Sequence, residues 1–491
     1  MWKCDVCGYV HRGDEPPEIC PICGVGRDRF SRLEVDSAKK NTISGVGMWR
    51  CTICNYVHEG EVPEKCPVCA ADASLFEADE EAPKAVTEGH LEHVVIVGAG
   101  IAGITAAEQV LLEKGGHAAI TIVSDEPGLP YYRLNLTRLM ALQIPESALT
   151  MKPLSFFNEN PITLVEGAVR SIVQGDKQVK LKDGTVIKYD ALILANGAHA
   201  FIPPIAGVEK QGVHPLRTLA DAHAILSELS PDANVIVVGC GVLGLEAAGA
   251  ISNRVKSVTV LESAQWAMVR QLNRAAGNRL VAYLKTRNIE VMTGVTIKAI
   301  EGDASVRCVV LEDGTRLDAD VVVVSTGVRP NMHLAKSCGI ETARGILVDD
   351  HMRTSHPDVY AAGDVAEHRG VVYGLWPSAF TQGFVAGTCA AGGFASFKSM
   401  APFNQLKVLD VELYSIGQIE PLDGSYSVFE AATESVYHYL VMHDRKLVGA
   451  VLFGNTSLAP AISEAIEAGT CIDELQTLLE ALPGLDAFAQ K

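Results

Sequence analysis

The sequence of 491 residues lacks any apolar run long enough to cross a membrane. Its longest apolar stretch, residues 94–107, contains three glycines and falls short of the roughly 20 residues that a membrane helix needs. The first residues, Met1-Trp2-Lys3-Cys4, include no basic segment that leads into an apolar run, as a secretory signal or transit peptide would. These absences predict a cytoplasmic protein with no membrane partner.

Positive charge is scarce as well, because 41 lysines and arginines are set against 59 aspartates and glutamates. The formal net charge of −18 is spread along the chain and is not gathered in a tail. Such a balance argues against a polyanionic partner such as nucleic acid. The chain is too long for one hydrophobic core, so we expect several domains.

Cysteine is missing between Cys69 and Cys240, and this gap separates two kinds of cysteine. Eight of the 13 cysteines precede it as four Cys-x-x-Cys pairs. Such pairs in a reducing compartment indicate metal or redox chemistry and not structural disulfides. The later cysteines stand alone and are interpreted as small buried apolar residues: Cys240, Cys308, Cys338, Cys389 and Cys471.

The paired cysteines belong to an internal repeat. The sequence Met-Trp-Lys-Cys-x-x-Cys-Gly-Tyr-Val-His at residues 1–11 recurs with small changes at residues 48–58. Each copy later has a Cys-Pro-x-Cys pair, followed seven residues on by Phe30 or Phe76. We therefore predict two copies of one small module, at residues 1–34 and 48–78. Polar linkers are expected at residues 35–47 and 79–92.

Each module presents four thiolates on two turns, which suits the tetrahedral preference of Zn(II) or of a single iron ion. The aromatic residues of the modules favour iron, because they could shield the site from water. A module this small also needs aromatic rings as its core, so zinc, which has no accessible redox change, stays the alternative. The predicted ligands are Cys4, Cys7, Cys20 and Cys23 in the first module and Cys51, Cys54, Cys66 and Cys69 in the second.

A glycine-rich turn follows an apolar strand at two places beyond the modules. The first turn carries Gly98, Gly100 and Gly103, and the strand after its helix is followed by Asp125 and Glu126. Glycine permits the tight turn and a close approach to a pyrophosphate, which the N-terminus of the helix attracts. An acid at the end of the next strand can accept hydrogen bonds from a ribose.

The second glycine turn repeats the same order of features. It carries Gly239, Gly241 and Gly244, and the strand after its helix ends at Glu262. Two such turns in strand, turn, helix and strand context predict two dinucleotide sites. Glu262 would repel a 2'-phosphate, so the second site is expected to prefer NADH to NADPH.

The modules resemble the rubredoxin family, in the short form found at the end of rubrerythrins. The motif is Cys-x-x-Cys-Gly-Tyr-Val followed by Cys-Pro-x-Cys-Gly, and the first copy matches it fully, with Gly8 and Gly24. The second copy has Asn55 and Ala70 at these turns. Since alanine adopts a positive φ poorly, the second site is expected to differ in potential or in metal.

The rest of the chain resembles the two-domain flavoprotein disulfide reductase superfamily. The supporting motifs lie at residues 189–198, 326–331 and 359–364. The resemblance implies FAD in the first dinucleotide fold and NAD(P)H in the second, with Asp364 on the ribityl chain. The further cofactor-binding residues expected from these motifs are Asn196, Gly197, Gly327 and Gly363.

We therefore expect an α/β fold with two Rossmann-like dinucleotide-binding domains, as in glutathione reductase. A small α+β C-terminal domain should follow them, and the two rubredoxin-like metal-binding domains precede them. The expected boundaries are residues 93–211 and 331–400 for the FAD-binding domain, 212–330 for the NAD-binding domain and 401–491 for the C-terminal domain.

Superfamily members that reduce disulfides carry a cysteine pair beside the flavin, and related oxidases and peroxidases carry one cysteine there. This chain has none in the corresponding segment, so thiol chemistry at the flavin is not expected. The segment instead reads Pro-Tyr-Tyr-Arg-Leu-Asn-Leu-Thr-Arg at residues 130–138 and resembles a motif of ferredoxin and rubredoxin reductases.

That resemblance assigns roles to four residues. Arg133 is expected to bind the cofactor, and Arg138 replaces a lysine that flanks the flavin. Glu246 matches a residue near the nicotinamide, and Trp376 begins a motif close to the pyrimidine end of the flavin. We expect Arg138, Glu246 and Trp376 to be the catalytic residues.

These features predict a flavoenzyme of the NADH:rubredoxin oxidoreductase type. It would hold FAD, take a hydride from NADH and pass single electrons through its own two iron sites to a downstream acceptor protein, either rubredoxin or a protein that reduces oxygen, peroxide or superoxide. The alternative is an NADH oxidase or peroxidase whose modules bind zinc and recruit partners. A non-enzymatic zinc-ribbon adaptor is disfavoured by the intact glycine motifs. Assembly into a homo-oligomer is left open.

Overall fold

The computed structural model describes residues 92–398, 403–408 and 411–471. Short segments of the N-terminal modules are described as well, namely residues 2–4, 10–11, 15–16, 18, 26–27, 30–32, 47–51, 57–60, 62–64, 73 and 76–78. The chain divides into two compact units. Unit 1 comprises Met1–Arg133, Glu146–His199 and Arg329–Met400, and unit 2 comprises Leu134–Pro145, Ala200–Val328 and Ala401–Lys491. Within the described ranges, no helix has the length and apolar character of a membrane span.

Unit 1 is built around a five-stranded parallel sheet in the order β25-β13-β7-β8-β9. Its middle strands are short apolar runs that are buried along their length, as expected of a parallel sheet covered on both faces. The strands are β7 (His93–Val97), β8 (Ala119–Ser124), β9 (Ile162–Glu166), β13 (Ala191–Leu194) and β25 (Val359–Ala361).

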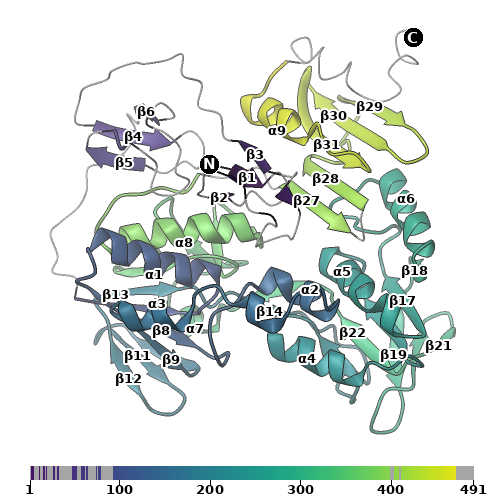
Figure 1. The fold of residues 1–491 in the computed structure, drawn as a ribbon, viewed down its shortest axis with the longest axis horizontal. Helices are drawn as coiled ribbons and strands as arrows, with labels where there is room; N and C mark the ends of the chain where they lie inside the picture. The colour runs from purple at the N-terminus through teal and green to yellow at the C-terminus, as the bar shows by residue number, and fades with distance from the viewer. Residues whose placement is uncertain are drawn as a thin grey trace. The chain divides into compact units, whose positions relative to one another are not determined.

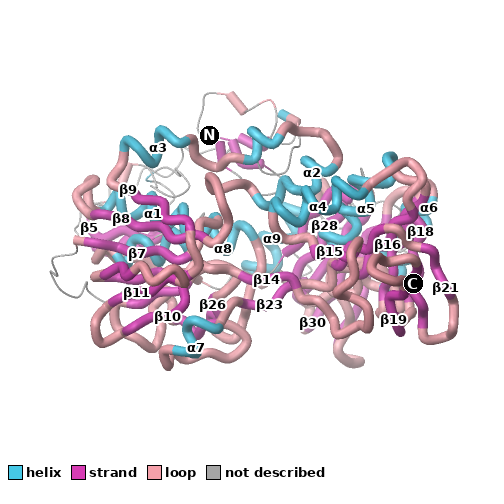
Figure 2. Tube along the Cα trace, turned by 90° about the horizontal axis from the view of Figure 1, so that it is seen from below, coloured by secondary structure: helices cyan, strands magenta, loops and turns pink. Residues whose placement is uncertain are grey.

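Helices α1 (Ile101–Glu113) and α8 (Trp376–Ala390) lie side by side in unit 1 (Figures 1 and 2). Glycines of α8 allow this close approach, because a Cβ at Gly383 would stand 2.3 Å from the carbonyl oxygen of Ala102. A Cβ at Gly387 would stand 2.4 Å from that of Ala106. The two helices therefore share one apolar core with strands of the sheet.

Smaller elements complete unit 1. An antiparallel sheet contains β10 (Val169–Val173), β11 (Gln178–Leu181) and β12 (Val186–Lys188). A parallel pair contains β24 (Ile346–Val348) and β26 (Ala366–His368). The remaining helical segments of unit 1 are η4 (Glu146–Leu149), α3 (Leu154–Glu159) and α7 (His333–Ser337), and η3 (Arg133–Asn135) spans the boundary with unit 2. The chain passes between the units in β14 (Ala198–Ala200) and β23 (Val328–Pro330).

Unit 2 repeats the parallel sheet, in the order β15-β22-β16-β17-β18. Its strands are β15 (Val213–Pro215), β16 (Asn234–Val238), β17 (Ser257–Glu262), β18 (Ile289–Thr293) and β22 (Val321–Val324). Its helices are α2 (Leu136–Met140), α4 (Leu219–Glu228), α5 (Val242–Ile251), η5 (Ser252–Arg254) and α6 (Arg274–Lys285). An antiparallel sheet of β19 (Ile297–Glu301), β20 (Cys308–Leu311) and β21 (Arg316–Asp318) follows.

The C-terminal part of unit 2 is a five-stranded antiparallel sheet with one helix against it (Figure 1). In sheet order the strands are β27 (Phe403–Val408), β28 (Val411–Gly417), β31 (Lys446–Phe453), β30 (Tyr437–His443) and β29 (Tyr426–Ala432). Helix α9 (Ala459–Ala468) ends at Gly469, whose φ of +63° makes a left-handed cap. A buried hydrogen bond of 2.8 Å joins Asn273 Nδ2 to Tyr437 Oη, between the start of α6 and β30.

The two N-terminal modules share one topology. Strand order is β2-β1-β3 in the first and β5-β4-β6 in the second. The register is the same as well, since Cys4 pairs with Phe30 and Cys51 pairs with Phe76. The sequence repeat is therefore a structural repeat. The strands are β1 (Trp2–Cys4), β2 (Val10–His11), β3 (Phe30–Arg32), β4 (Gly47–Cys51), β5 (Val57–Gly60) and β6 (Phe76–Ala78).

The predicted metal ligands cannot be compared with a described geometry. Of Cys4 and Cys51 only the backbone is described, and the other six cysteines lie outside the described residues. The fold class itself is confirmed: two parallel dinucleotide-type sheets, a small α+β portion at the C-terminus and two small N-terminal modules.

Candidate dinucleotide-binding sites

The first glycine turn leaves no room for side chains at two of its three glycines. Gly98 follows β7 with a φ of +110°, and a Cβ there would stand 2.2 Å from the carbonyl oxygen of Ala195. A Cβ at Gly103 would stand 2.0 Å from the carbonyl oxygen of Gly98. Gly100 differs, because a Cβ there would meet nothing within 4 Å. No side chain caps α1 at Gly100, so the N-terminus of this helix faces open space suited to a phosphate.

Polar atoms at the ends of the neighbouring strands complete this cradle. The N–H of Gly363, which follows β25, donates to Gln382 Oε1 at 2.8 Å. Gln382 is 1% exposed, yet its Nε2 has no hydrogen-bond partner among the described residues. Asn196 follows β13 and donates from Nδ2 to the carbonyl oxygen of Asn331 at 2.9 Å.

The side-chain oxygen of Asn196, Oδ1, is also buried and has no hydrogen-bond partner among the described residues. Buried polar atoms are normally hydrogen-bonded, so the Nε2 of Gln382 and the Oδ1 of Asn196 mark groups that a polar ligand would satisfy. Both residues adjoin the carboxyl ends of parallel strands, where ligands of open α/β sheets bind. The residues of unit 1 therefore fit a bound FAD.

Two acids follow β8, and they have different surroundings. Asp125 is exposed. Glu126 forms an ion pair with Arg133 and accepts a hydrogen bond of 2.5 Å from Tyr131 Oη. Burial acts to lower the pKa of Arg133, but the neighbouring Tyr131, Glu126 and Asp364 raise it overall. Arg133 is therefore a fixed positive charge near Asp364.

Trp376 begins α8, six residues before Gln382. Its ring is 5.7 Å from the ring of Tyr132, with the planes inclined at 39°. Both rings are partly buried and pack against the core of unit 1. This aromatic pair belongs to the same unit as the first glycine turn.

The second glycine turn reproduces the first. Gly239 follows β16 with a φ of +107°, and a Cβ there would stand 2.3 Å from the carbonyl oxygen of Ser325. A Cβ at Gly244 would stand 2.1 Å from the carbonyl oxygen of Gly239, whereas Gly241 again faces open space. Gly327, beyond β22, has a φ of +97° and also faces open space. The two turns therefore offer the same kind of cradle.

Glu262 ends β17, and its carboxylate is held at the second turn. Its Oε2 accepts the N–H of Cys240 at 2.9 Å, and its Oε1 accepts the N–H of Ala264 at 2.8 Å. The acid that the sequence predicted for ribose binding therefore lies beside the middle of the glycine turn. Its charge would repel a phosphate on the 2'-position of a ribose bound there.

Cys240 lies within this turn and is fully buried. Burial, helped by the charge of Glu262, raises the pKa of its thiol to about 12. Burial likewise raises the pKa of Cys389 to about 12. Neither thiol ionises near neutral pH, so neither is a redox nucleophile.

Glu246 lies on α5, two residues after Gly244. Burial raises the pKa of its carboxyl to about 7. Thr137 donates a hydrogen bond to Glu246 Oε2 at 3.2 Å from the neighbouring helix α2. Sequence reasoning did not single out Thr137, although it precedes Arg138 directly. The guanidinium of Arg138 donates instead to Asn135 Oδ1 at 3.5 Å.

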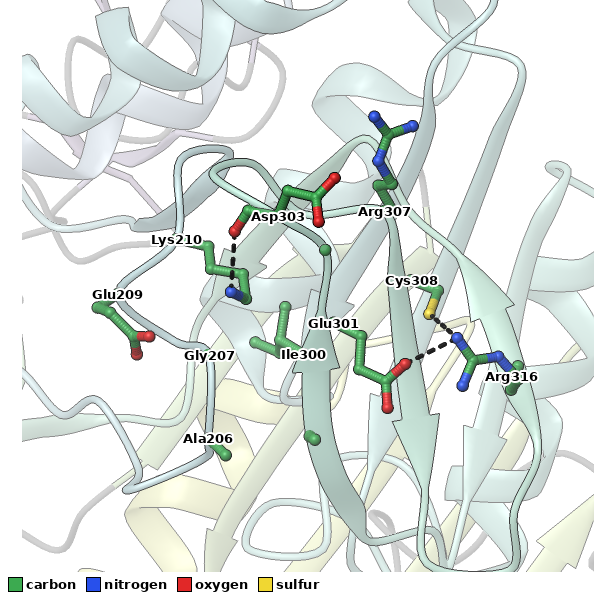
Figure 3. A pocket seen from close by; sticks show the side chains of 12 residues that line it. Ala206, Gly207, Glu209, Lys210, Ile300, Glu301, Asp303, Arg307, Cys308 and Arg316 are labelled. Atoms are coloured by element: carbon green, nitrogen blue, oxygen red, sulfur yellow. Dashed lines mark hydrogen bonds and ion pairs between the residues drawn. The ribbon is translucent and has the colours of Figure 1, made fainter.

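A hollow of about 590 Å³ lies elsewhere in unit 2, on β19 and β20 (Figure 3). Figure 3 shows two polar contacts inside it: Lys210 donates to the carbonyl oxygen of Asp303 at 3.1 Å, and Arg316 pairs with Glu301 at 2.8 Å. Arg316 also contacts the sulfur of Cys308 at 3.0 Å. No residue predicted to bind a cofactor lines this hollow.

Comparison with known families agrees with this geometry. Residues 92–383 match the family described as pyridine nucleotide-disulphide oxidoreductase. The chain belongs to this family. Residues 402–470 match the rubredoxin NAD+ reductase C-terminal domain, and residues 2–31 and 49–77 match the rubredoxin-like domain of rubrerythrin. The family resemblances inferred from the motifs are thus confirmed.

Two individual proteins illustrate what the chain is similar to. The NADH-rubredoxin oxidoreductase of Clostridium acetobutylicum is 32% identical over 386 residues, which are 78% of this chain and 97% of that protein. The nitrite reductase [NAD(P)H] of Bacillus subtilis is 33% identical over 387 residues and 78% of this chain. The chain spans about half the length of that relative, 48%.

Two solved structures superpose on most of the chain. The crystal structure of NADH:rubredoxin oxidoreductase from Clostridium acetobutylicum superposes with a TM-score of 0.69 at 32% identity, covering 79% of this chain and 99% of that one. A water-forming NADH oxidase from Lactobacillus brevis superposes with a TM-score of 0.72 at 20% identity, covering 78% and 92%. The second likeness shows a shared fold and no more.

Proposed function

We propose that the chain is an FAD-dependent NADH oxidoreductase that passes single electrons to iron in its own rubredoxin-like modules and from there to a downstream acceptor protein. The observation that carries the proposal is the duplicated glycine turn, with the cradle of unpaired buried atoms in unit 1 and the acid Glu262 in unit 2. The relatives named NADH-rubredoxin oxidoreductase support it.

The FAD would be held by unit 1. Gly98, Gly100 and Gly103 give the pyrophosphate access to the start of α1, and Asp364 with the Gly363 turn takes the ribityl chain. Gln382 Nε2 and Asn196 Oδ1 supply the free donor and acceptor. A bound flavin accepts two electrons together and releases them one at a time, so it can connect a hydride donor to one-electron carriers.

The NADH would be held by unit 2. Gly239, Gly241 and Gly244 repeat the phosphate cradle, and Glu262 favours a free ribose hydroxyl over a phosphate. Glu246 is proposed to lie near the nicotinamide and Arg138 to flank the flavin as a permanent cation. Trp376, packed on Tyr132, is proposed to bound the flavin on its pyrimidine side.

Electrons must leave the flavin without a thiol. The sequence has no cysteine between Cys69 and Cys240, and Cys240 is held protonated by burial. The rubredoxin-like matches at residues 2–31 and 49–77 support a one-electron route within the same chain. Iron in a four-thiolate site changes charge by one electron, which zinc does not.

Metal analysis of protein purified without oxygen tests this route. We expect two iron ions per chain and iron-thiolate absorption above the flavin bands. The substitutions Cys7→Ser and Cys54→Ser should each halve the iron content, whereas Cys338→Ser, outside the modules, should leave it unchanged. Zinc in both modules would refute the electron route and support modules that recruit partners.

A further inference from the structure

Helix α2 places one polar side chain against α5, and both helices belong to unit 2. Thr137 is 7% exposed, and its hydroxyl donates to Glu246 Oε2 at 3.2 Å. The two residues are 109 positions apart in the chain. A buried hydroxyl that donates to a carboxyl group fixes the direction of that group and favours its charged form.

Within the part of the chain that the structure describes, no cation pairs with the carboxyl group of Glu246. The elements packed on α5 carry four charged residues: Arg138 on α2, Arg254 on η5, Glu262 on β17 and Lys407 on β27, whose side chain lies outside the described residues. Arg138 donates to Asn135 Oδ1 and Arg254 to the carbonyl oxygen of Met140, at 3.5 and 3.0 Å. Glu262 is occupied by N–H groups of its own turn.

The ionisation of Glu246 is therefore balanced between two opposing effects. Burial raises the pKa of its carboxyl to about 7, and the hydrogen bond from Thr137 acts in the lowering direction. Near neutral pH a small change in this balance alters the charged fraction. Removing the Thr137 hydroxyl would leave more of Glu246 protonated at pH 7.

We propose that Thr137 is a positioning residue that orients the carboxyl group of Glu246 and favours its ionised form for hydride transfer from NADH. The inference rests on the proposed function, because it takes Glu246 to lie near the nicotinamide. Loss of hydride leaves a positive charge on the nicotinamide ring. A nearby carboxylate stabilises that charge as it develops, whereas a neutral carboxylic acid does so far less.

The test compares Thr137→Val with Thr137→Ser in the FAD-loaded full-length protein. Valine keeps the shape and removes the hydroxyl, whereas serine keeps the hydroxyl. The matched control is Thr388→Val, because Thr388 is also buried and its hydroxyl has no hydrogen-bond partner among the described residues. One readout is the infrared carboxyl band of Glu246, assigned with Glu246→Gln and followed against pH. The other is the rate of flavin reduction by NADH in a single turnover against pH.

Thr137→Val should shift the titration midpoint of the carboxyl band to higher pH. It should slow flavin reduction at pH 7 about tenfold, the size expected for one hydrogen bond to a charged group. Most of that loss should be recovered at higher pH. Thr137→Ser and Thr388→Val should behave like the parent protein.

An unshifted carboxyl band in Thr137→Val would overturn the inference. So would a loss of rate by the same factor at every pH, which would show a structural role only. These results leave the proposed function standing, because the parent protein is still reduced by NADH. A parent protein whose flavin is not reduced by NADH would instead refute the proposed function itself.

Discussion

The side-chain oxygen of Gln382 accepts the backbone N–H of Gly363 at 2.8 Å, and this contact aims the buried Nε2 of Gln382 away from any described protein acceptor. The contact joins α8 to the turn after β25, which carries Asp364. A buried donor left unpaired by the protein costs stability, so it is expected to have a partner when the cofactor is bound.

Gln382→Glu tests this relationship. The carboxylate keeps an acceptor for Gly363 but has no N–H to donate. We expect the dissociation constant of FAD to rise about tenfold or more, measured from the fluorescence of released flavin. Gln174→Glu is the matched control, because it makes the same change at a buried amide nitrogen outside the predicted cofactor-binding residues. Equal FAD affinity in Gln382→Glu and the parent would remove Gln382 from the site.

Two glycines of the second turn, Gly239 and Gly241, are expected to respond differently to substitution by alanine. Gly241→Ala adds a methyl group in open space, so it should leave the melting temperature unchanged and raise the dissociation constant of NADH about tenfold, since the methyl stands where the pyrophosphate approaches. Gly239→Ala puts a Cβ 2.3 Å from the carbonyl oxygen of Ser325. It should lower the melting temperature. Calorimetry measures the effect on the melting temperature, and titration with NADH measures the effect on binding. Normal NADH affinity in Gly241→Ala would contradict the placement of the phosphates.

Glu262 is expected to set the choice of nicotinamide. Glu262→Gln removes the charge and keeps one acceptor oxygen, which can serve one of the two N–H groups of Cys240 and Ala264. The ratio of kcat/KM for NADH to that for NADPH should fall about tenfold, mainly because NADPH improves. Glu290→Gln, an exposed charge change on β18, should not alter the ratio. An unchanged ratio in Glu262→Gln would mean that selectivity arises elsewhere.

The raised pKa of Glu246 predicts how stability depends on pH. In the unfolded chain this carboxyl titrates near its ordinary value of 4.5, and in the folded chain near 7. The folded state therefore holds the proton of Glu246 more tightly than the unfolded chain does. The free energy of unfolding falls as the pH rises from about 4.5 through 7, because the folded state resists the loss of this proton. Glu246→Gln should raise the melting temperature of the flavin-free protein at pH 8 and change it little at pH 4. An equal effect at both values would show that the carboxyl is not perturbed.

Short-range patterns made much of this molecule predictable. The glycines of both turns, the acid Glu262 and the repetition of the N-terminal module, in which Cys4 pairs with Phe30 as Cys51 does with Phe76, all reflect local spacing. The bond from Thr137 to Glu246 does not, because it joins residues 109 positions apart through the packing of α2 on α5.

Other features also depended on the tertiary structure. Asn196 and Asn331 exchange two hydrogen bonds across 135 positions, which no local pattern indicates. Spacing could not choose between Asp125 and Glu126 as the partner of Arg133, because both follow the same strand. The fold brings Arg133 and Tyr131 back onto Glu126. Which acid meets the ribose of FAD stays a prediction.

The most direct test of the proposed electron route is rapid mixing of the oxygen-free protein with NADH while the full visible spectrum is recorded. The flavin absorption should decrease first, and the iron-thiolate absorption of the modules should then decrease in the same molecules, at a rate independent of protein concentration. Reduction of the flavin with both iron-thiolate centres unchanged would contradict the route.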